Sequence, residues 1–141
     1  YYGSEWGLAG QRTAQSDRPL RPSLDLAVMQ AAPPLPGLAE FIARLAQIRQ
    51  NTASLRYGDL SDVSVALEQY AFARDWAGET SLVLLNAAAN SAQLTLSVAL
   101  PEGTRLADPL APEGGFWVNN GRLYDVPLQP RQARILSTAP C

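Results

Sequence analysis

The sequence predicts a mainly β protein in which an irregular N-terminal segment and one helix precede an antiparallel β-sandwich. Three observations support this fold class. Prolines and glycines interrupt residues 1–36 without a sustained period, and apolar residues then recur at helical spacing from Gly37 to Asn51. Beyond the helix, apolar and polar residues alternate with period two, which is typical of half-buried strands. The sequence therefore divides into residues 1–52 and 53–141.

The first 36 residues predict a long irregular loop. They contain five prolines, at Pro19, Pro22, Pro33, Pro34 and Pro36. Loops of this length inside compact domains are usually functional. The segment opens with two tyrosines before a glycine, a pattern typical of the tail of a buried strand, whereas free chain ends are usually polar. We therefore expect further sequence to precede Tyr1.

The next segment predicts a one-sided helix of about four turns. Its apolar positions share one face and are Leu38, Phe41, Ile42, Leu45 and Ile48. Pro36 suits the first turn, and Arg49 complements the negative end of the helix. Asn51 is a residue that adopts the left-handed conformation with which many helices end.

The remaining residues predict seven or eight short strands. Leu94–Leu100 alternates four aliphatic residues with smaller ones, and Leu82–Leu85 is apolar on both sides. Asn119-Asn120-Gly121 supplies the positive φ angles of a tight hairpin turn. Further strands are expected at Tyr70–Phe72 and around Leu55–Leu60, Arg105–Leu106 and Arg134–Leu136. Such a series favours an antiparallel sandwich or barrel.

Composition excludes several functions. The net charge is −2, the pI is near 5.0, and the eleven cationic residues are scattered arginines, so nucleic-acid binding is not expected. No apolar run approaches the roughly 20 residues of a membrane span. Histidine and lysine are absent, and the one cysteine is Cys141, so we expect an inert thiol, no metal site and no cofactor. The lack of disulfides favours a cytoplasmic location.

Six blocks in fixed order carry a resemblance to a known family. They read YYGSEWG, SDRPLRP, LAEFIARLAQIRQNTASLRYGD, YAFAR, SLVLLN and LQPRQARIL. Together they resemble the C-terminal end of an α-amylase-family glycoside hydrolase, and most of all its neopullulanase, cyclomaltodextrinase and α-glucosidase-like branches. A loop and one helix entered from a strand-like YY are typical of the last β/α unit of a (β/α)8 barrel.

The resemblance implies that this chain contains the end of a catalytic barrel and the domain that follows it, with the rest of the barrel upstream. Residues 1–52 would be the loop after the eighth strand and the eighth helix of the catalytic barrel, and residues 53–141 the C-terminal β-sandwich, domain C. The family hydrolyses α-glucosidic bonds with retention, using an Asp nucleophile, a Glu acid/base and a second Asp. All three would lie upstream of Tyr1. No residue here is then catalytic, and we expect the chain alone to be inactive.

The same resemblance implies that Asp17 and Arg21 contact the α-glucan or maltooligosaccharide substrate. In neopullulanase-like relatives, an Asp and an Arg four residues later contact glucose units on the non-reducing side of the cleavage point. Many relatives have an extra Asp-Pro step and a double arginine, whereas this chain reads DRPLRP. The alternative is a local ion pair of Asp17 with Arg21 or Arg18 that stabilises a surface loop.

Neighbouring residues are expected to support the pocket. The resemblance places Tyr2 and Glu5 near the barrel mouth, where they would shape the pocket without transferring protons. Trp6 either stacks on a sugar ring or packs against nearby loops. For Trp76 and Trp117, core packing is favoured over a surface sugar platform.

Other functions stay open. The β-sandwich could be an independent carbohydrate-binding or protein-interaction module. A freestanding enzyme would have to use carboxylates such as Asp59 and Asp62. An uncovered apolar helix face costs about 1.5–3 kcal/mol for each large side chain, so the chain is a possible homo-oligomer.

Overall fold

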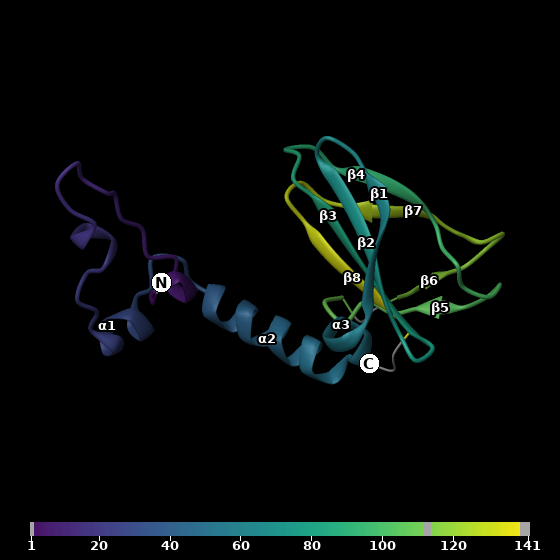
Figure 1. The fold of residues 1–141 in the computed structure, drawn as a ribbon, viewed down its shortest axis with the longest axis horizontal. Coiled ribbons are helices and arrows are strands. Elements are labelled where there is room, and N and C mark those ends of the chain that lie inside the picture. Colours follow the sequence, from purple (N-terminus) through teal and green to yellow (C-terminus); the bar gives the residue numbers. More distant parts are fainter. Residues whose placement is uncertain (1, 112–113, 139–141) are drawn as a thin grey trace. The chain divides into compact units, whose positions relative to one another are not determined.

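The computed structural model describes residues 2–111 and 114–138 (Figure 1). The chain forms two compact units that are divided between Ile48 and Arg49. That division falls inside a helix. The predicted domain boundary between residues 1–52 and 53–141 stays a prediction. The expectations for Tyr1 and Cys141 concern positions outside the described residues.

The first unit contains more regular structure than the sequence predicts. It has two 3-10 turns, η1 (Ser4–Trp6) and η2 (Arg18–Leu20), and a short helix, α1 (Leu26–Ala31). Asp25 begins α1, because its carboxylate accepts hydrogen bonds from the backbone N–H groups of Ala27 and Val28 at 2.9 and 3.3 Å. The prediction of an irregular segment through residue 36 is therefore wrong at α1.

The predicted long helix is confirmed as α2 (Leu38–Asn51), and Gly37 precedes it with a left-handed φ of 82°. Its predicted ending is wrong, because Asn51 is not among the residues with positive φ. Thr52 is instead extended, and a second short helix, α3 (Ala53–Tyr57), follows where the sequence predicts a strand. The Arg49 side chain donates a hydrogen bond to the Leu55 carbonyl oxygen, which links the end of α2 to α3.

Gly58 explains why the strand starts later than predicted. A Cβ at this position would lie 2.5 Å from the Ser54 carbonyl oxygen and 2.8 Å from the Asp75 backbone nitrogen. Only glycine therefore lets the chain leave α3 so close to the neighbouring strand. The first strand begins at the next residue, Asp59.

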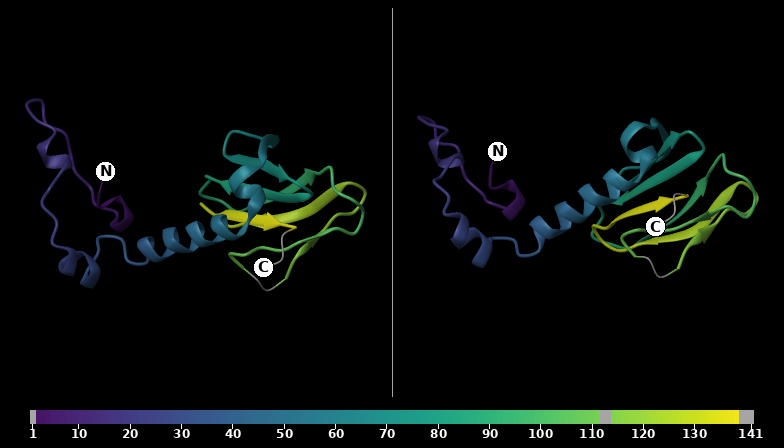
Figure 2. Two further views of the ribbon diagram at one scale, coloured as in Figure 1. Left: turned by 60° about the horizontal axis from the view of Figure 1, so that its bottom comes forward. Right: turned by 90° about the horizontal axis from the view of Figure 1, so that it is seen from below.

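The second unit contains α3 and, within the described residues, eight antiparallel strands. One sheet has four strands in the order β1-β2-β3-β8, and two further pairs are β4-β7 and β5-β6. In Figure 2 the four-stranded sheet and the β4-β7 pair lie as two layers. The bounds are β1 (Asp59–Val65), β2 (Gln69–Trp76), β3 (Glu79–Asn86), β4 (Ala92–Ser97), β5 (Arg105–Leu106), β6 (Phe116–Trp117), β7 (Arg122–Leu128) and β8 (Ala133–Ser137). The predicted mainly β class and antiparallel sandwich are confirmed.

The core lies between the two layers and follows the predicted alternation. In the β2-β3 register Ala71 pairs with Leu84 and Ala73 with Leu82, and all four side chains are buried. Leu96 of β4 is buried opposite them, while its neighbours in sequence, Thr95 and Ser97, are exposed. The remaining buried aliphatic core residues are Leu106, Val118, Leu123, Val126, Leu128 and Leu136.

The predicted hairpin is confirmed between β6 and β7. Asn119 and Arg122 exchange two backbone hydrogen bonds of 2.9 and 3.0 Å. Asn120 and Gly121 between them have φ angles of 49° and 69°. Positive φ at both central residues is the type I′ geometry that matches the twist of flanking strands.

A buried ion pair joins β8 to the β5-β6 region. Arg134 Nε lies 3.3 Å from Asp108 Oδ2, and the two side chains are 16% and 5% exposed. Asp108 Oδ1 also accepts a 2.8 Å hydrogen bond from the Leu110 N–H, and the Arg134 guanidinium lies 5.4 Å from the centre of the Phe116 ring. Each charge therefore has a partner inside the sandwich, as burial requires.

Three buried serine hydroxyls connect α3 to the four-stranded sheet. Ser54 Oγ lies 2.7 Å from Ser81 Oγ, and Ser81 Oγ donates to Ser137 Oγ at 3.0 Å. The backbone N–H of Ser54 donates to a carboxylate oxygen of Glu79 at 2.6 Å. Because α3, β3 and β8 each contribute one hydroxyl, the three elements have a fixed relative position.

We expect Ser81→Ala to destabilise the sandwich by about 1–3 kcal/mol, because it removes the middle hydroxyl and leaves two buried hydroxyls with a lost partner. Urea unfolding gives the free energy, and amide exchange should accelerate in α3. Ser97→Ala, on the exposed side of β4, is the control and should stay within about 0.5 kcal/mol of the parent. Equal losses in the two variants would refute the role of the serine chain.

Candidate functional site

The predicted substrate-contact residues lie in a loop, residues 8–22, whose base is closed by two close approaches. The Tyr2 hydroxyl donates a 3.0 Å hydrogen bond to the Pro22 carbonyl oxygen. Gly10 lies against the returning chain, because a Cβ there would be 2.6 Å from the Pro19 carbonyl oxygen. The two arms of the loop therefore lie side by side at its base.

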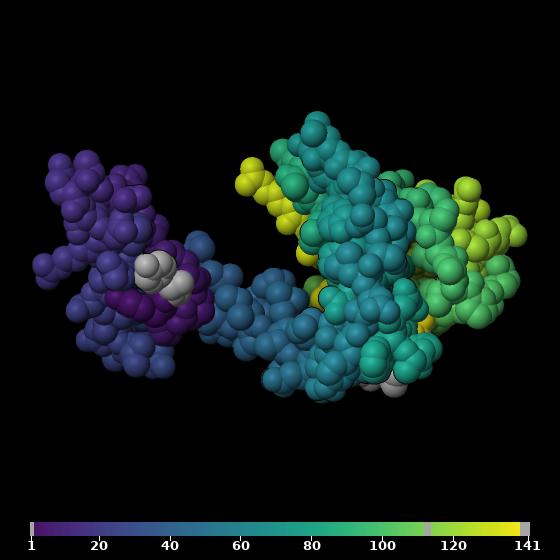
Figure 3. All heavy atoms as spheres, viewed as in Figure 1, coloured from purple at the N-terminus to yellow at the C-terminus, as the bar shows by residue number. Residues whose placement is uncertain are grey.

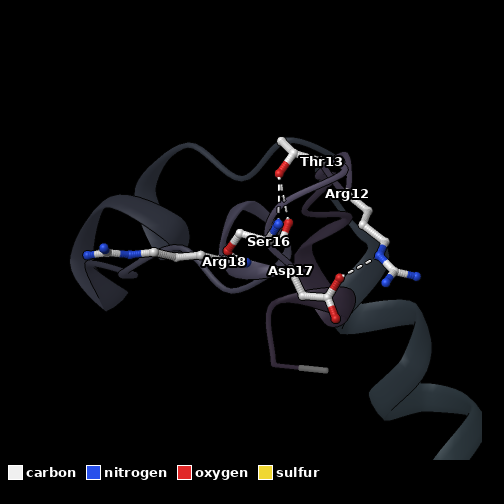
Figure 4. Close-up of polar contacts among 5 residues, drawn as sticks. All are labelled: Arg12, Thr13, Ser16, Asp17 and Arg18. Atoms are coloured by element: carbon white, nitrogen blue, oxygen red, sulfur yellow. Dashed lines mark hydrogen bonds and ion pairs between the residues drawn. The ribbon is translucent and has the colours of Figure 1, made fainter.

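A tight turn forms the tip of the loop (Figure 4). The Thr13 N–H and hydroxyl both donate to the Ser16 carbonyl oxygen, at 3.1 and 3.0 Å. In return the Ser16 N–H donates to Thr13 Oγ1 at 3.0 Å, and the Arg18 N–H donates to Ser16 Oγ at 3.0 Å. Asp17 is held between these groups, so its backbone position is determined by local hydrogen bonds.

The Asp17 carboxylate forms an ion pair across the loop with Arg12. Arg12 Nε and Asp17 Oδ1 are 2.8 Å apart, and the two side chains are 75% and 47% exposed. Figure 4 shows the Arg18 side chain extending away from Asp17. The proposed local pairing with Arg18 or Arg21 is therefore wrong in its partner. The sequence did not predict Arg12 as the partner, because only the Thr13–Ser16 turn brings Arg12 back to Asp17. Such an exposed ion pair stabilises the loop by at most about 1 kcal/mol.

Asp17 and Arg21 flank η2. The Asp17 carbonyl oxygen accepts from the Leu20 N–H and the Arg18 carbonyl oxygen from the Arg21 N–H, both at 3.0 Å. Arg21 lines an open hollow in the first unit, whose other lining residues are Ser16, Arg18, Pro19, Pro22 and Ser23. Two of its lining residues are therefore arginines, whose guanidinium groups are planar hydrogen-bond donors suited to hydroxyl groups.

The two predicted supporting residues lie in the turns that precede the loop, and Tyr2 contacts its base. Tyr2 lies in a turn, 52% exposed, and holds Pro22 through its hydroxyl. Glu5 is half-buried within η1. Trp6 is also half-buried, its carbonyl oxygen accepts a 3.0 Å hydrogen bond from the Leu35 N–H, and it lines a small hollow together with Leu35. This placement favours packing over an open sugar-stacking position for Trp6.

In the sandwich, the structure contradicts two expectations. Trp76 and Trp117 are 47% and 57% exposed, so neither is a core residue. Asp59 pairs with Asp75 and Asp62 with Phe72 in the β1-β2 register, so the two carboxylates project from opposite faces of the strand. They cannot form the facing carboxyl pair that a freestanding glycosidase would need.

Asp62 has a structural partner instead. The Tyr70 hydroxyl donates a 2.6 Å hydrogen bond to Asp62 Oδ1. This bond, together with desolvation and the carboxylate charge, raises the pKa of Tyr70 above its ordinary value of 10.0.

Among residues 2–111 and 114–138, no three potential metal ligands are clustered. Within the same ranges, no helix combines the length and apolar character required to cross a membrane.

Comparison with known proteins finds solved structures only. No protein-family model matches the sequence, and no curated protein matches it. An Anoxybacillus α-amylase matches the whole chain with a TM-score of 0.81 and 26% identity, and the match covers 28% of that enzyme. A Geobacillus thermoleovorans α-amylase complexed with acarbose matches 97% of the chain with a TM-score of 0.81, at 21% identity and 28% coverage of the enzyme. A cyclomaltodextrin glucanotransferase with a three-domain ABC distribution matches the whole chain with a TM-score of 0.77, at 21% identity and 29% coverage.

The fold is therefore that of the C-terminal part of a glycoside hydrolase. The resemblance to the α-amylase family, carried by six sequence blocks, is confirmed over the full chain. The chain spans less than a third of the length of these enzymes. The likeness to the neopullulanase branch stays a prediction.

We expect Gly10→Val to open the base of the loop, because the new side chain would collide with the Pro19 backbone. Trypsin cleavage after Arg12 should then accelerate several-fold, since Arg18 and Arg21 are protected by the prolines that follow them. Mass spectrometry of the digest measures this rate. Ala14→Val at the exposed loop tip is the control, and equal acceleration there would show that Gly10 does not hold the base.

Proposed function

We propose that this chain is the C-terminal part of a retaining α-glucan hydrolase. In this proposal the sandwich supports the catalytic barrel, and the loop of residues 8–22 lines the substrate pocket. The main support is the match of the whole chain to an α-amylase, at a TM-score of 0.81 and 26% identity, over 28% of that enzyme. Structural neighbours solved with acarbose, maltotriose and maltose share the fold and favour the same substrate class.

The loop would contact substrate through Asp17 and Arg21. An ionised carboxylate accepts hydrogen bonds from sugar hydroxyls and a guanidinium donates them, and such charge-assisted bonds are about twice as strong as neutral ones. Arg12 contacts one carboxylate oxygen of Asp17, and about half of the Asp17 side chain remains accessible to a ligand. Tyr2 and Glu5 would support this arrangement from the loop base.

The sandwich would pack on the barrel through the outer face of its four-stranded sheet. On this face Val65 pairs with Tyr70 and Tyr70 with Leu85, while Phe72 pairs with Val83 in the next row. Val65 is 70% exposed and Leu85 37% exposed. A row of partly exposed apolar side chains favours contact with another protein surface, and most of the neighbours' length lies outside this match.

The apolar face of α2 supports the same proposal. Phe41 and Ile42, both on the predicted apolar face, are 45% and 43% exposed. An eighth barrel helix would bury such a face against the outside of the barrel strands. Without that barrel, the exposed face favours self-association of the chain.

A different observation favours a second candidate function. The exposed Trp117 is compatible with an independent glucan-binding or protein-binding module rather than a purely supporting domain. The two functions can be separated by experiment. The hydrolase function requires a catalytic barrel, whereas the binding-module function requires that the 141-residue chain alone bind a glucan or a protein.

We expect the isolated chain to associate through α2, because burial of the apolar face removes it from water. Phe41→Glu combined with Ile42→Glu should shift the sedimentation coefficient toward that of the monomer. Gln47→Glu adds a charge to the polar side of the helix and serves as the control. A parent chain that is already monomeric at tens of micromolar would contradict this prediction.

The hydrolase proposal is tested by comparing the chain with the longer polypeptide that includes its upstream coding sequence. The 141-residue chain should release no sugar from maltotriose, whereas the longer polypeptide should hydrolyse it. Asp17→Ala in the longer polypeptide should lower kcat/KM about tenfold or more through loss of a charge-assisted hydrogen bond. Asp59→Ala, an exposed carboxylate in the sandwich, is the control.

Two results would overturn the proposal. One is a longer polypeptide that folds but hydrolyses no α-glucan. The other is sugar release by the 141-residue chain itself, which would require catalytic carboxylates within it.

A further inference from the structure

We propose that Trp117 and Arg105 form an α-glucan-binding platform on the sandwich, separate from the loop of residues 8–22. The site lies on the short β5-β6 pair, which Figure 3 shows in green at the surface. The choice of an α-glucan as ligand rests on the proposed function. The platform itself rests on the geometry of the residues in this pair.

Strand register brings the two side chains together. Arg105 and Trp117 are direct partners across β5 and β6, so they project from the same face. The other partners, Leu106 and Phe116, point to the core, where Leu106 is fully buried. Trp117 remains 57% exposed, with the Arg105 guanidinium carbon 5.8 Å from its ring centre.

A hydrogen bond already orients the exposed Arg105 side chain. Its Nη2 donates a 2.6 Å hydrogen bond to the Gly114 carbonyl oxygen. Its guanidinium also lies directly over Gly115, where a Cβ would be 2.7 Å from Arg105 Nε. A guanidinium whose orientation is already restrained loses less conformational entropy when it binds, which favours affinity.

The backbone under Trp117 is equally constrained. The Val118 N–H donates to the Thr104 carbonyl oxygen, and the Gly103 N–H donates to the Val118 carbonyl oxygen, both at 2.9 Å. Beyond them, Glu102 Oε2 accepts a 2.8 Å hydrogen bond from the Asn120 N–H at the hairpin turn. The segment that carries the indole is therefore held against residues 102–104 by backbone and side-chain hydrogen bonds.

These groups match the chemistry of a neutral hexose chain. An aromatic ring offers an apolar surface for the C–H face of a sugar, and a planar guanidinium donates hydrogen bonds to the hydroxyl groups at the sugar's edge. A carboxylate, Glu102, lies near the same hairpin and disfavours a polyanionic ligand. An uncharged oligosaccharide satisfies all three features.

Trp76 presents a different environment. Its ring centre is 5.6 Å from that of Tyr57 with the planes tilted by 48°, and it lies on the outer face of the four-stranded sheet. We have assigned that face to packing against the barrel. Trp76 is therefore a control: a half-exposed tryptophan on the same sandwich that packs against Tyr57, and it is the Tyr57 ring over which Arg56 lies at 4.7 Å.

The test is a titration of the 141-residue chain with maltoheptaose, followed by the indole N–H signals in NMR spectra. We expect the Trp117 signal to shift in a saturable manner and the Trp76 signal to stay in place. Trp117→Ala should weaken binding at least about tenfold, and Arg105→Ala about three- to tenfold, through loss of the aromatic surface and of the charged donor. Trp76→Ala should bind as the parent does.

A two-dimensional amide spectrum of each variant verifies that the sandwich remains folded. Arg105→Lys provides a second variant that keeps the charge but loses the planar donor, so it should bind as weakly as Arg105→Ala. The proposal is overturned if maltoheptaose produces no saturable shift, or if Trp117→Ala and Trp76→Ala weaken binding equally.

The outcomes also separate this inference from the hydrolase proposal. Hydrolysis of maltotriose by the longer polypeptide without binding by the 141-residue chain would refute the platform alone. Binding at Trp117 combined with an inactive longer polypeptide would refute the hydrolase function and leave the platform intact.

Discussion

The chain of buried serine hydroxyls determines how α3 packs on the four-stranded sheet. Ser54, Ser81 and Ser137 lie in three different elements, and a buried hydroxyl without a partner is costly, so α3 has one favourable position on the sheet. Gly58 then directs the chain into β1 at the edge of the same sheet. The outer face beside α3 keeps its partly exposed apolar residues, and this is the face that the proposed barrel would cover.

The sandwich thus has distinct surfaces with distinct chemistry. Its inner face is closed by leucines and alanines, with the Asp108–Arg134 ion pair as a polar exception. Its outer face carries partly exposed apolar side chains, whereas the β5-β6 pair presents an aromatic ring beside a hydrogen-bonded guanidinium. A supporting role and a ligand-binding role can therefore coexist in one domain, since they use different strands.

Sequence patterns predicted the parts of this fold that are determined by interactions between residues close in sequence. The alternation around Leu96 and the Asn120-Gly121 turn depend on residues close in sequence, and both were confirmed. The short helix α1 was missed although its capping residue, Asp25, was visible. The Arg12–Asp17 pair and the exposure of Trp117 depend on a turn and on a strand pairing, so composition and spacing alone did not reveal them.

The closed base of the loop has a consequence for how such a site could diversify. Tyr2 and Gly10 hold the two arms together independently of what lies between them, whereas the Thr13–Ser16 turn is exposed and held only by its own hydrogen bonds. Insertions or exchanges at that tip would leave the anchored stem in place. Sequence changes at the tip could therefore alter what the loop contacts while the stem keeps its fold.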